Sequence, residues 1–255
     1  MKKSIRIFFL WMSVAPAVFA QTGEHAGGGR FLKRTEYNFL NNTKIIEGKE
    51  YGICNLDSKT DVEKLFFGDF NAQMEFFVSP SFEGASGFRI IKDTTDGSYI
   101  LEVKHISNYK QAVEQAEEKF RTIGIPGELY FSIPKEIKDL TRDHNMTMYP
   151  KQQAERLKLY QVETLSFPIS NRFAEKLYTK TVSSIDNFRA KGKPAGIFDG
   201  TTVTFRCIVD DEVWTLTIHE PKGDIRIFSD LCRQIITDAE ADKLEESEYI
   251  KILKK

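Results

Sequence analysis

A pair of alternating segments near the C-terminal end constrains the fold more than any other feature of the sequence. Residues 201–209 and 212–220 alternate apolar and polar side chains with a period of two, and Asp210 and Asp211 separate them. A period of two is typical of a half-buried strand, and aspartate is favoured in turns. The two segments therefore predict an antiparallel hairpin, and its buried face holds these residues: Val203, Phe205, Cys207, Val209, Trp214, Leu216 and Ile218.

A strand, a hairpin and a helix are also expected earlier in the chain. Residues 70–78 alternate in the same way, which predicts another half-buried strand. Residues 87–106 hold two apolar runs separated by DTTDG, whose Asp and Gly residues favour a turn. Residues 109–120 carry apolar side chains at helical spacing. We expect this helix to lie on the apolar face of the hairpin that precedes it.

The middle of the chain, residues 124–156, is polar and contains three prolines, which is typical of short helical or irregular pieces. A strand is expected at 157–168, with a bulge near Glu163, where the apolar phase changes. Ser170 is a favourable helix N-cap for the segment that follows it. A last amphipathic helix is expected over 224–239.

These elements predict an α+β fold in which antiparallel β-hairpins carry helices packed on one face. The order strand, hairpin, helix occurs twice within one globular domain, residues 36–240. This repetition raises the hypothesis of two similar halves, residues 36–123 and 157–240. Residues 241–255 form a charged C-terminal tail. The sequence contains neither G-x-G-x-x-G nor G-x-x-x-x-G-K, the usual nucleotide-binding motifs.

The N-terminal residues have the pattern of an export signal. Three basic residues precede an apolar stretch that ends on Val18 and Ala20, the small-residue pattern of a secretory cleavage site. We therefore expect residues 1–20 to be cleaved, leaving a flexible, glycine-rich leader over 21–35. The remaining sequence has no apolar run long enough to span a bilayer. A periplasmic or secreted location is the expectation.

Charge and motif content exclude several function classes. The chain has 36 Lys and Arg residues against 37 Asp and Glu residues, and nucleic-acid binding usually requires a strongly basic surface. The metal motifs H-E-x-x-H and C-x-x-C do not occur. We therefore expect no metal, no cofactor and no nucleic-acid partner, and we expect a protein or glycan partner instead.

The sequence contains three cysteines. Cys207 lies on the apolar face of the predicted hairpin and Cys232 on the apolar face of the predicted last helix, so the two could form a disulfide. Two unlinked core thiols are the alternative, because free cysteine is among the most buried residue types. Cys54 is a candidate nucleophile only if a base lies within hydrogen-bond reach, and a structural role is its alternative.

The polar face of the 201–219 hairpin holds a row of candidate binding residues: Thr202, Thr204, Arg206, Thr215, Thr217 and His219. A histidine among hydroxyls and an arginine could bind a carboxylate or act as a general base. The alternative is a sheet face that is solvated or covered by another element. His105 is expected to be half-buried on its strand, and His144 to lie in a polar loop or at a helix end.

Three stretches carry a resemblance to known proteins: SGFRIIKDTTDGSYILEVKHISNYK, FPISNRFAEKLYTKTVSSIDNF and DGTTVTFRCIVDDEVWTLTIHEPKGDIRIFSDLCRQIITDA. They resemble segments of exported proteins of unknown function from Bacteroides-type gut bacteria. The resemblance covers roughly residues 70–240. It implies a Gram-negative envelope or secreted location and brings no catalytic residues with it.

The leading functional hypothesis is a noncatalytic exported binding or interaction module, because clear hairpin and helix patterns occur without a catalytic motif. Whether the protein is an enzyme stays open. A small envelope hydrolase that uses His219 or Cys54 with partners distant in sequence is one alternative. An inhibitor or immunity-type protein is another.

Overall fold

The computed structural model describes the backbone of residues 31–37 and 48–53, and describes in full residues 59–69, 71–93, 95–188, 199–210 and 212–253. The expected export signal and Cys54 lie outside the described residues. The strands are β1 (Phe31–Tyr37), β2 (Gly48–Ile53), β3 (Met74–Pro80), β4 (Ser86–Lys92), β5 (Tyr99–Ile106), β6 (Val162–Ile169), β7 (Thr201–Val209) and β8 (Glu212–His219). The helices are α1 (Asp61–Phe66), α2 (Tyr109–Lys119), the 3-10 turn η2 (Gly127–Leu129), α3 (Lys135–Leu159), α4 (Asn171–Asp186), α5 (Asp224–Glu240) and α6 (Glu246–Ile252).

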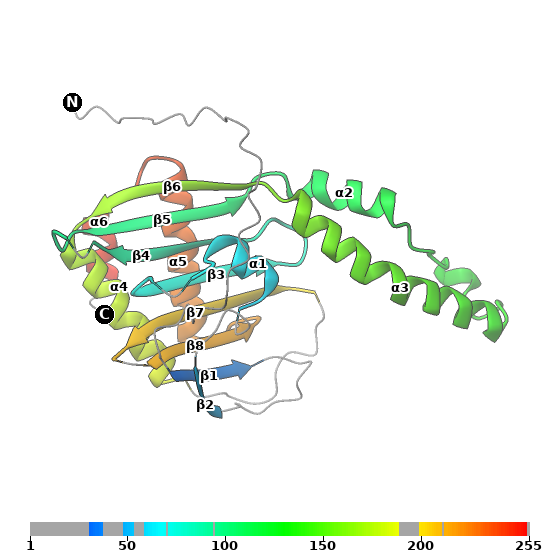
Figure 1. The fold of residues 1–255 in the computed structure, drawn as a ribbon, viewed down its shortest axis with the longest axis horizontal. Helices are drawn as coiled ribbons and strands as arrows, with labels where there is room; N and C mark the ends of the chain where they lie inside the picture. The colour runs from blue at the N-terminus through cyan, green and yellow to red at the C-terminus, as the bar shows by residue number, and fades with distance from the viewer. Residues whose placement is uncertain are drawn as a thin grey trace.

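All of these strands form one sheet in the order β2-β1-β8-β7-β3-β4-β5-β6 (Figure 1). The six strands from β8 to β6 pair antiparallel, and β1 joins β8 in parallel. The expected α+β class and both expected hairpins, β4–β5 and β7–β8, are confirmed. Turn chemistry accounts for both, since Gly97 (φ 73°) and Asp210 (φ 52°) adopt the left-handed conformation that glycine and aspartate tolerate best.

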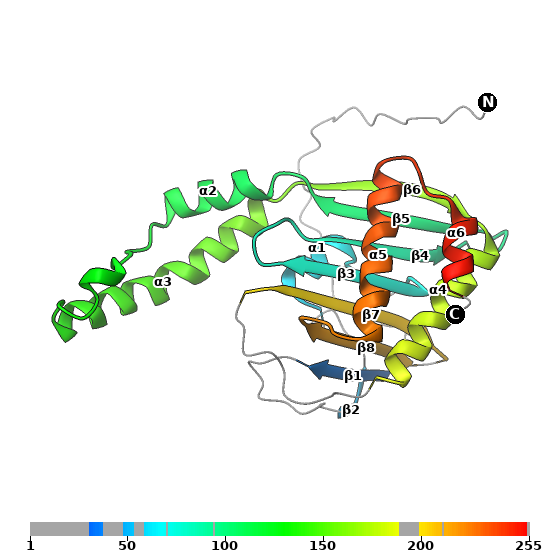
Figure 2. The same cartoon turned by 180° about the vertical axis from the view of Figure 1, so that it is seen from behind.

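Helices α4, α5 and α6 cover one face of the sheet, as Figure 2 shows. The main core lies between these helices and the sheet, and it includes the alternating apolar residues of β3, β4, β5, β7 and β8. Ser170 accepts a hydrogen bond from the backbone N–H of Phe173 and caps α4, as expected. The charged C-terminal segment includes α6, which is docked on this core through the buried side chains of Tyr249 and Leu253.

Helix α1 lies on the opposite face of the sheet (Figure 1). Thr60 and Glu63 form a capping box that fixes its start, because each side chain bonds to the other residue's backbone N–H. A second, smaller apolar cluster lies under α1: Phe66, Phe67, Phe77, Ala85 and Ile106. Burial of Phe77 and Ile106 here shows that the sheet is covered on parts of both faces.

Helices α2 and α3 form a helical hairpin that projects away from the sheet (Figures 1 and 2). We call residues 109–159 the arm. The prediction that the 109–120 helix lies on the β4–β5 hairpin is wrong, since α2 packs on α3 and α5 covers that part of the sheet. The prediction of short pieces over 124–156 is also wrong for most of its length, because α3 is a single helix of 25 residues.

Two boundaries also differ from expectation. The expected bulge near Glu163 does not form, since β6 pairs with β5 without a register shift from Val162 to Ile169. The change in apolar phase instead marks the end of α3 at Leu159, before β6 begins. Strand β1 begins at Phe31, within the range expected to be a flexible leader.

Candidate functional site

The row of candidate residues on the polar face of β7 and β8 is brought together in cross-strand pairs. The Oγ1 atom of Thr202 lies 3.1 Å from Nδ1 of His219, and the hydroxyls of Thr204 and Thr217 are 3.2 Å apart. Arg206 stands opposite Thr215 in the same register. The pairs differ in environment: Thr204, Arg206 and Thr215 are buried, whereas Thr202, Thr217 and His219 are partly exposed.

The buried end of this row belongs to a charge network that joins α1 to the sheet. We call Lys59, Glu63, Glu75 and Arg206 the buried network. Arg206 donates to Glu75 Oε2 at 2.7 Å and to Glu63 Oε1 at 3.1 Å, while Lys59 donates to Glu75 Oε1 at 2.9 Å. At most 5% of any of these four side chains is exposed to solvent. Charge alternates across four adjacent strands, because Arg206, Glu75, Arg89 and Glu102 are successive register partners.

Electrostatic surroundings set the protonation of the two cations in the buried network. Burial, together with the nearby charge of Arg206, lowers the pKa of Lys59, although the carboxylates of Glu75 and Glu63 act in the opposite direction. Burial also works against the charge of Arg206, but the carboxylates of Glu75 and Glu63 outweigh it and raise the pKa of Arg206. Each charge is compensated and out of contact with solvent, so this part of the row is suited to holding α1 on the sheet.

The other described residues considered from the sequence lie outside this row and outside the buried network. The possible disulfide between Cys207 and Cys232 is not found: both side chains are buried in the main core without being bonded to each other, and burial raises the pKa of Cys232 well above its ordinary value. His105 is half-buried as expected, and its Nδ1 lies 2.9 Å from Oε1 of Glu240. His144 lies within α3 rather than in a loop.

Hydrogen bonds and aromatic packing fix the arm where it joins the sheet. The side chain of Asn108 donates to the carbonyl of Leu159 at 2.8 Å and accepts from the backbone N–H of Gln161 at 2.8 Å. These two hydrogen bonds join the start of α2 to the end of α3. The rings of Tyr109 and Tyr160 stack at 6.2 Å and pack against the smaller apolar cluster. Burial raises the pKa of Tyr160, and the neighbouring Tyr109 raises it further.

The inner half of the arm is packed by small residues and polar contacts. Ala112 and Ala116 of α2 are fully buried, which lets α2 and α3 approach closely. The buried side chain of Gln152 donates to the carbonyl of Phe120 at 2.7 Å. Arg156 pairs with Glu117 at 2.8 Å. With about 1.5 Å of rise per residue, the 25 residues of α3 extend about 37 Å from its end at Leu159.

The outer end of the arm, residues 121–149, exposes a group of large apolar side chains: Ile123, Leu129, Tyr130, Phe131, Ile137, Leu140, Met146 and Tyr149. Phe131, just beyond η2, is 91% exposed. Single exposed apolar residues are ordinary on protein surfaces, whereas a concentrated group marks an interaction site. The α2–α3 hairpin that carries them projects away from the sheet (Figure 1), and none of these residues belongs to the main core.

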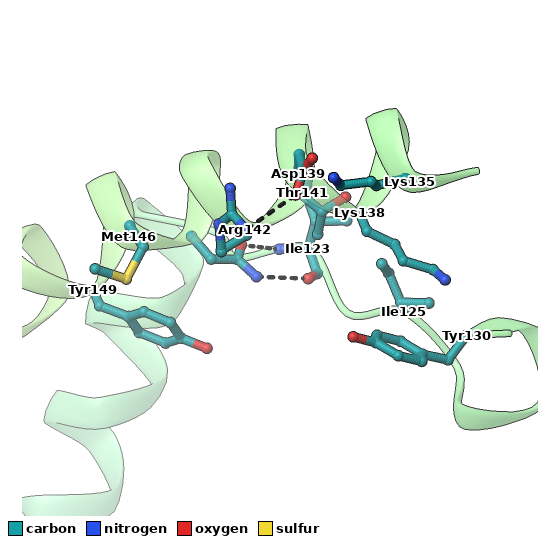
Figure 3. Close-up of a pocket in the computed structure, with 11 residues that line it drawn as sticks. Ile123, Ile125, Tyr130, Lys135, Lys138, Asp139, Thr141, Arg142, Met146 and Tyr149 are labelled. Atoms are coloured by element: carbon teal, nitrogen blue, oxygen red, sulfur yellow. Dashed lines mark hydrogen bonds and ion pairs between the residues drawn. The ribbon is translucent and has the colours of Figure 1, made fainter. Parts of the chain in front are cut away.

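A hollow of about 590 Å³ opens on one side of this outer end. Figure 3 shows Tyr130 and Tyr149 on opposite sides of it, with their hydroxyls directed toward each other. Ile123, Ile125 and Met146 supply further apolar wall. The remaining lining residues are polar or charged: Lys135, Lys138, Asp139, Thr141, Arg142 and Asn145.

Specific contacts hold the walls of the hollow in place. The side-chain amide of Asn145 accepts from the backbone N–H of Ile123 at 2.8 Å and donates to its carbonyl at 2.9 Å, fixing the 121–126 segment against α3. Nε2 of His144 lies 3.0 Å from the carbonyl oxygen of Arg121. Nζ of Lys138 lies 4.7 Å from the centre of the Tyr130 ring, a cation–π distance.

The hollow is not among the features expected from the sequence, because most of its residues come from a stretch that was expected to be polar, with short helical or irregular pieces. The run Leu129-Tyr130-Phe131 within that stretch was the available signal, since three consecutive large apolar residues are unusual in a solvated loop. The helical periodicity of α3 identifies the side that packs on α2. It does not show that the 121–131 segment stands off from α3 and leaves a hollow.

Neither a metal site nor a membrane-spanning helix is found where the structure describes the chain. No group of three or more His, Cys, Asp or Glu residues there is arranged to hold a metal ion. None of the described helices is both long and apolar enough to cross a bilayer. Comparison of the chain with protein-family models, curated proteins and solved structures found no match.

Proposed function

We propose that this protein is a noncatalytic binding module that engages a partner protein through the outer end of its arm. One observation carries the proposal: eight large apolar side chains are exposed on residues 121–149, around a hollow held open by hydrogen bonds. Burial of such a surface by a partner would be favourable at about 25 cal/mol for each Å² of apolar area removed from water.

The position of these side chains supports an interaction role over a structural one. The main core is formed by the sheet with α4, α5 and α6, and no residue of the arm belongs to it. The arm therefore adds exposed apolar surface without contributing to the main core. Aliphatic and aromatic side chains are mixed in the group, and aromatic residues and methionine are enriched in protein–protein interfaces.

We also propose that the protein acts outside the cytoplasm, in the periplasm or after secretion. The proposal rests on the signal-like residues 1–20 and on the resemblance to exported Bacteroides-type proteins. Mass spectrometry of the protein purified from its native cells tests it directly. A mature chain that begins at Gln21 supports export, and an intact Met1 in cytoplasmic protein refutes it.

A pair of photo-crosslinking variants tests the binding role. Benzoylphenylalanine replaces Phe131 at the end of the arm in one variant. In the other it replaces Phe82, which lies between β3 and β4. Phe82 is the matched control, because it is also a phenylalanine and is 71% exposed. The variants are produced in the native cells and irradiated there.

The expected result is a discrete adduct from the Phe131 position and not from the Phe82 position. The same adduct should form from a third probe at Met146, beside the hollow, and excess unmodified protein should compete it away. Equal labelling at both phenylalanine positions, or no adduct at the arm, would refute the proposal.

A further inference from the structure

The chemistry of the hollow identifies a class of partner, and this inference rests on the proposed binding function of the arm. We propose that the hollow binds an acidic amphipathic segment of the partner protein. An apolar side chain of that segment enters between Tyr130 and Tyr149, and a neighbouring carboxylate pairs with Lys135 and Lys138.

The shape of the hollow favours an inserted side chain over a flat contact. Its volume of about 590 Å³ falls in the range of about 300–1,000 Å³ that is usual for ligand sites. Ile123, Ile125 and Met146 line it together with the two tyrosine rings. An aliphatic or aromatic side chain would be surrounded by apolar atoms there, with two hydroxyls available to backbone groups of the same segment.

The charges around the hollow favour an acidic segment. Arg142 is already neutralised, because it contacts Asp139 at 3.0 Å and Asp143 at 3.2 Å. Among the described residues, no carboxylate lies within ion-pair distance of Lys135 or Lys138. Lys138 is held over the Tyr130 ring, so its ammonium group stays at the rim. Two uncompensated ammonium groups beside an apolar wall complement a carboxylate next to an apolar side chain.

A lipid surface fits the outer end of the arm less well. Residues 121–149 carry four basic and four acidic side chains, whereas binding to an anionic membrane surface uses an excess of Lys and Arg. The excess of positive charge is confined to the hollow itself, where three cations and one carboxylate line the wall.

Selection from a displayed library of short random peptides tests the inference. The full mature chain is the bait, and Lys135→Glu/Lys138→Glu is the counter-selection bait. Lys151→Glu is the charge control, because Lys151 is exposed on the same helix and does not line the hollow. Ile227→Ala is the apolar control, since Ile227 is 68% exposed on α5 and lies outside both the arm and the hollow. Circular dichroism checks that each variant keeps its fold.

Selected peptides are expected to carry Asp or Glu within one helical turn of a Leu, Ile, Met or aromatic residue. Binding of such a peptide should weaken about tenfold or more in Lys135→Glu/Lys138→Glu and in high salt, as rim charges do. It should weaken about thirtyfold in Tyr149→Ala, as for a buried aromatic anchor. The Lys151→Glu and Ile227→Ala variants should bind within about twofold of the unmodified chain.

Three outcomes would overturn the inference. Selected peptides could be basic or purely apolar, or they could bind the double lysine variant as well as the unmodified chain. The mature chain could also float with phosphatidylglycerol vesicles and select no peptide, which would assign the outer end to a lipid surface. An adduct at Phe131 with any of these results would leave the binding role intact and refute only the partner chemistry. If the Phe131 probe forms no adduct and no peptide is selected, the binding role itself is refuted.

Discussion

Glu75→Gln should be among the most destabilising single changes at a polar residue of this protein. The carboxylate of Glu75 is 3% exposed and neutralises two buried cations, Lys59 through Oε1 and Arg206 through Oε2. The glutamine amide keeps one acceptor oxygen and turns an N–H₂ group toward the other cation. The variant would therefore hold two buried cations against a single remaining carboxylate, that of Glu63.

The expected loss follows from the cost of an uncompensated buried charge. Removing one partner of a buried ion pair costs about 3–5 kcal/mol, because the remaining ion stays desolvated. For a domain of 150–250 residues each kcal/mol lowers Tm by about 2–4 °C, so the expected decrease is about 6–20 °C. Lys59 retains hydrogen bonds to the carbonyls of Phe67 and Asp69, which limits the loss to this range.

Glu102→Gln is the matched control, because Glu102 occupies the same cross-strand row two strands away. Its side chain is 16% exposed, and its partners keep other contacts: Arg89 pairs with Asp69 at 2.8 Å and Lys104 donates to the Phe66 carbonyl at 2.7 Å. This change should cost about 1 kcal/mol.

Urea titrations followed by circular dichroism measure both free energies of unfolding. A difference of less than about 1 kcal/mol between the two variants would refute the argument that desolvation makes the buried network sensitive. If Glu75→Gln does not fold, the double variant Lys59→Met/Glu75→Gln provides the measurement. It removes one stranded cation together with the carboxylate and should be more stable than Glu75→Gln alone.

The pH dependence of Glu75→Gln has a defined sign. Burial already lowers the pKa of Lys59 in the folded protein, and loss of the Glu75 carboxylate should lower that pKa further. Between the folded and unfolded pKa values the unfolded chain binds more protons, so stability rises with pH in that window. The deficit of Glu75→Gln should therefore shrink as the pH rises toward the ordinary lysine pKa. The Lys59→Met background should abolish this trend.

Three further changes test other parts of the fold. Phe205→Ala should cost about 3–5 kcal/mol in a urea titration, because its fully buried ring leaves a cavity in the main core; a loss below about 1 kcal/mol would contradict this packing. Ser170→Ala should cost about 1 kcal/mol by removing the N-cap of α4, and Ser170→Thr, which keeps a hydroxyl for the cap and for Glu246, should restore most of it. In a Cys54→Ser background, Cys207 and Cys232 should resist a thiol-specific reagent until urea unfolds the chain, since burial raises the pKa of Cys232; rapid labelling of the folded protein would contradict their burial.

Local sequence patterns were sufficient to predict the two hairpins and helices α4 and α5, which pack on the sheet. The alternation in β7 and β8 depends on the strand repeat of two, and Asp210 marks the turn between them. Ser170 and the apolar spacing of α4 and α5 depend on the helical repeat and on capping. These signals lie within about twenty residues of sequence, and they hold whatever the rest of the chain does.

The same local signals could not say what covers an apolar or a polar face. The buried alanines of α2 are equally suited to a sheet or to another helix, and the structure places them against α3. Glu75 was expected on a polar strand face, and only the packing of α1 shows that this face is buried. Likewise, the apolar run around Phe131 does not reveal that it lies at the end of an arm.

By itself, then, the sequence determined the α+β class, both hairpins and the phases of their buried faces, because backbone geometry couples side-chain direction to residue number. Only the tertiary structure decided which elements meet: the arm formed by α2 and α3, the buried network beneath α1 and the hollow between Tyr130 and Tyr149. Those contacts join residues far apart in the chain, and their partners are selected by packing and desolvation of the whole molecule rather than by any local repeat.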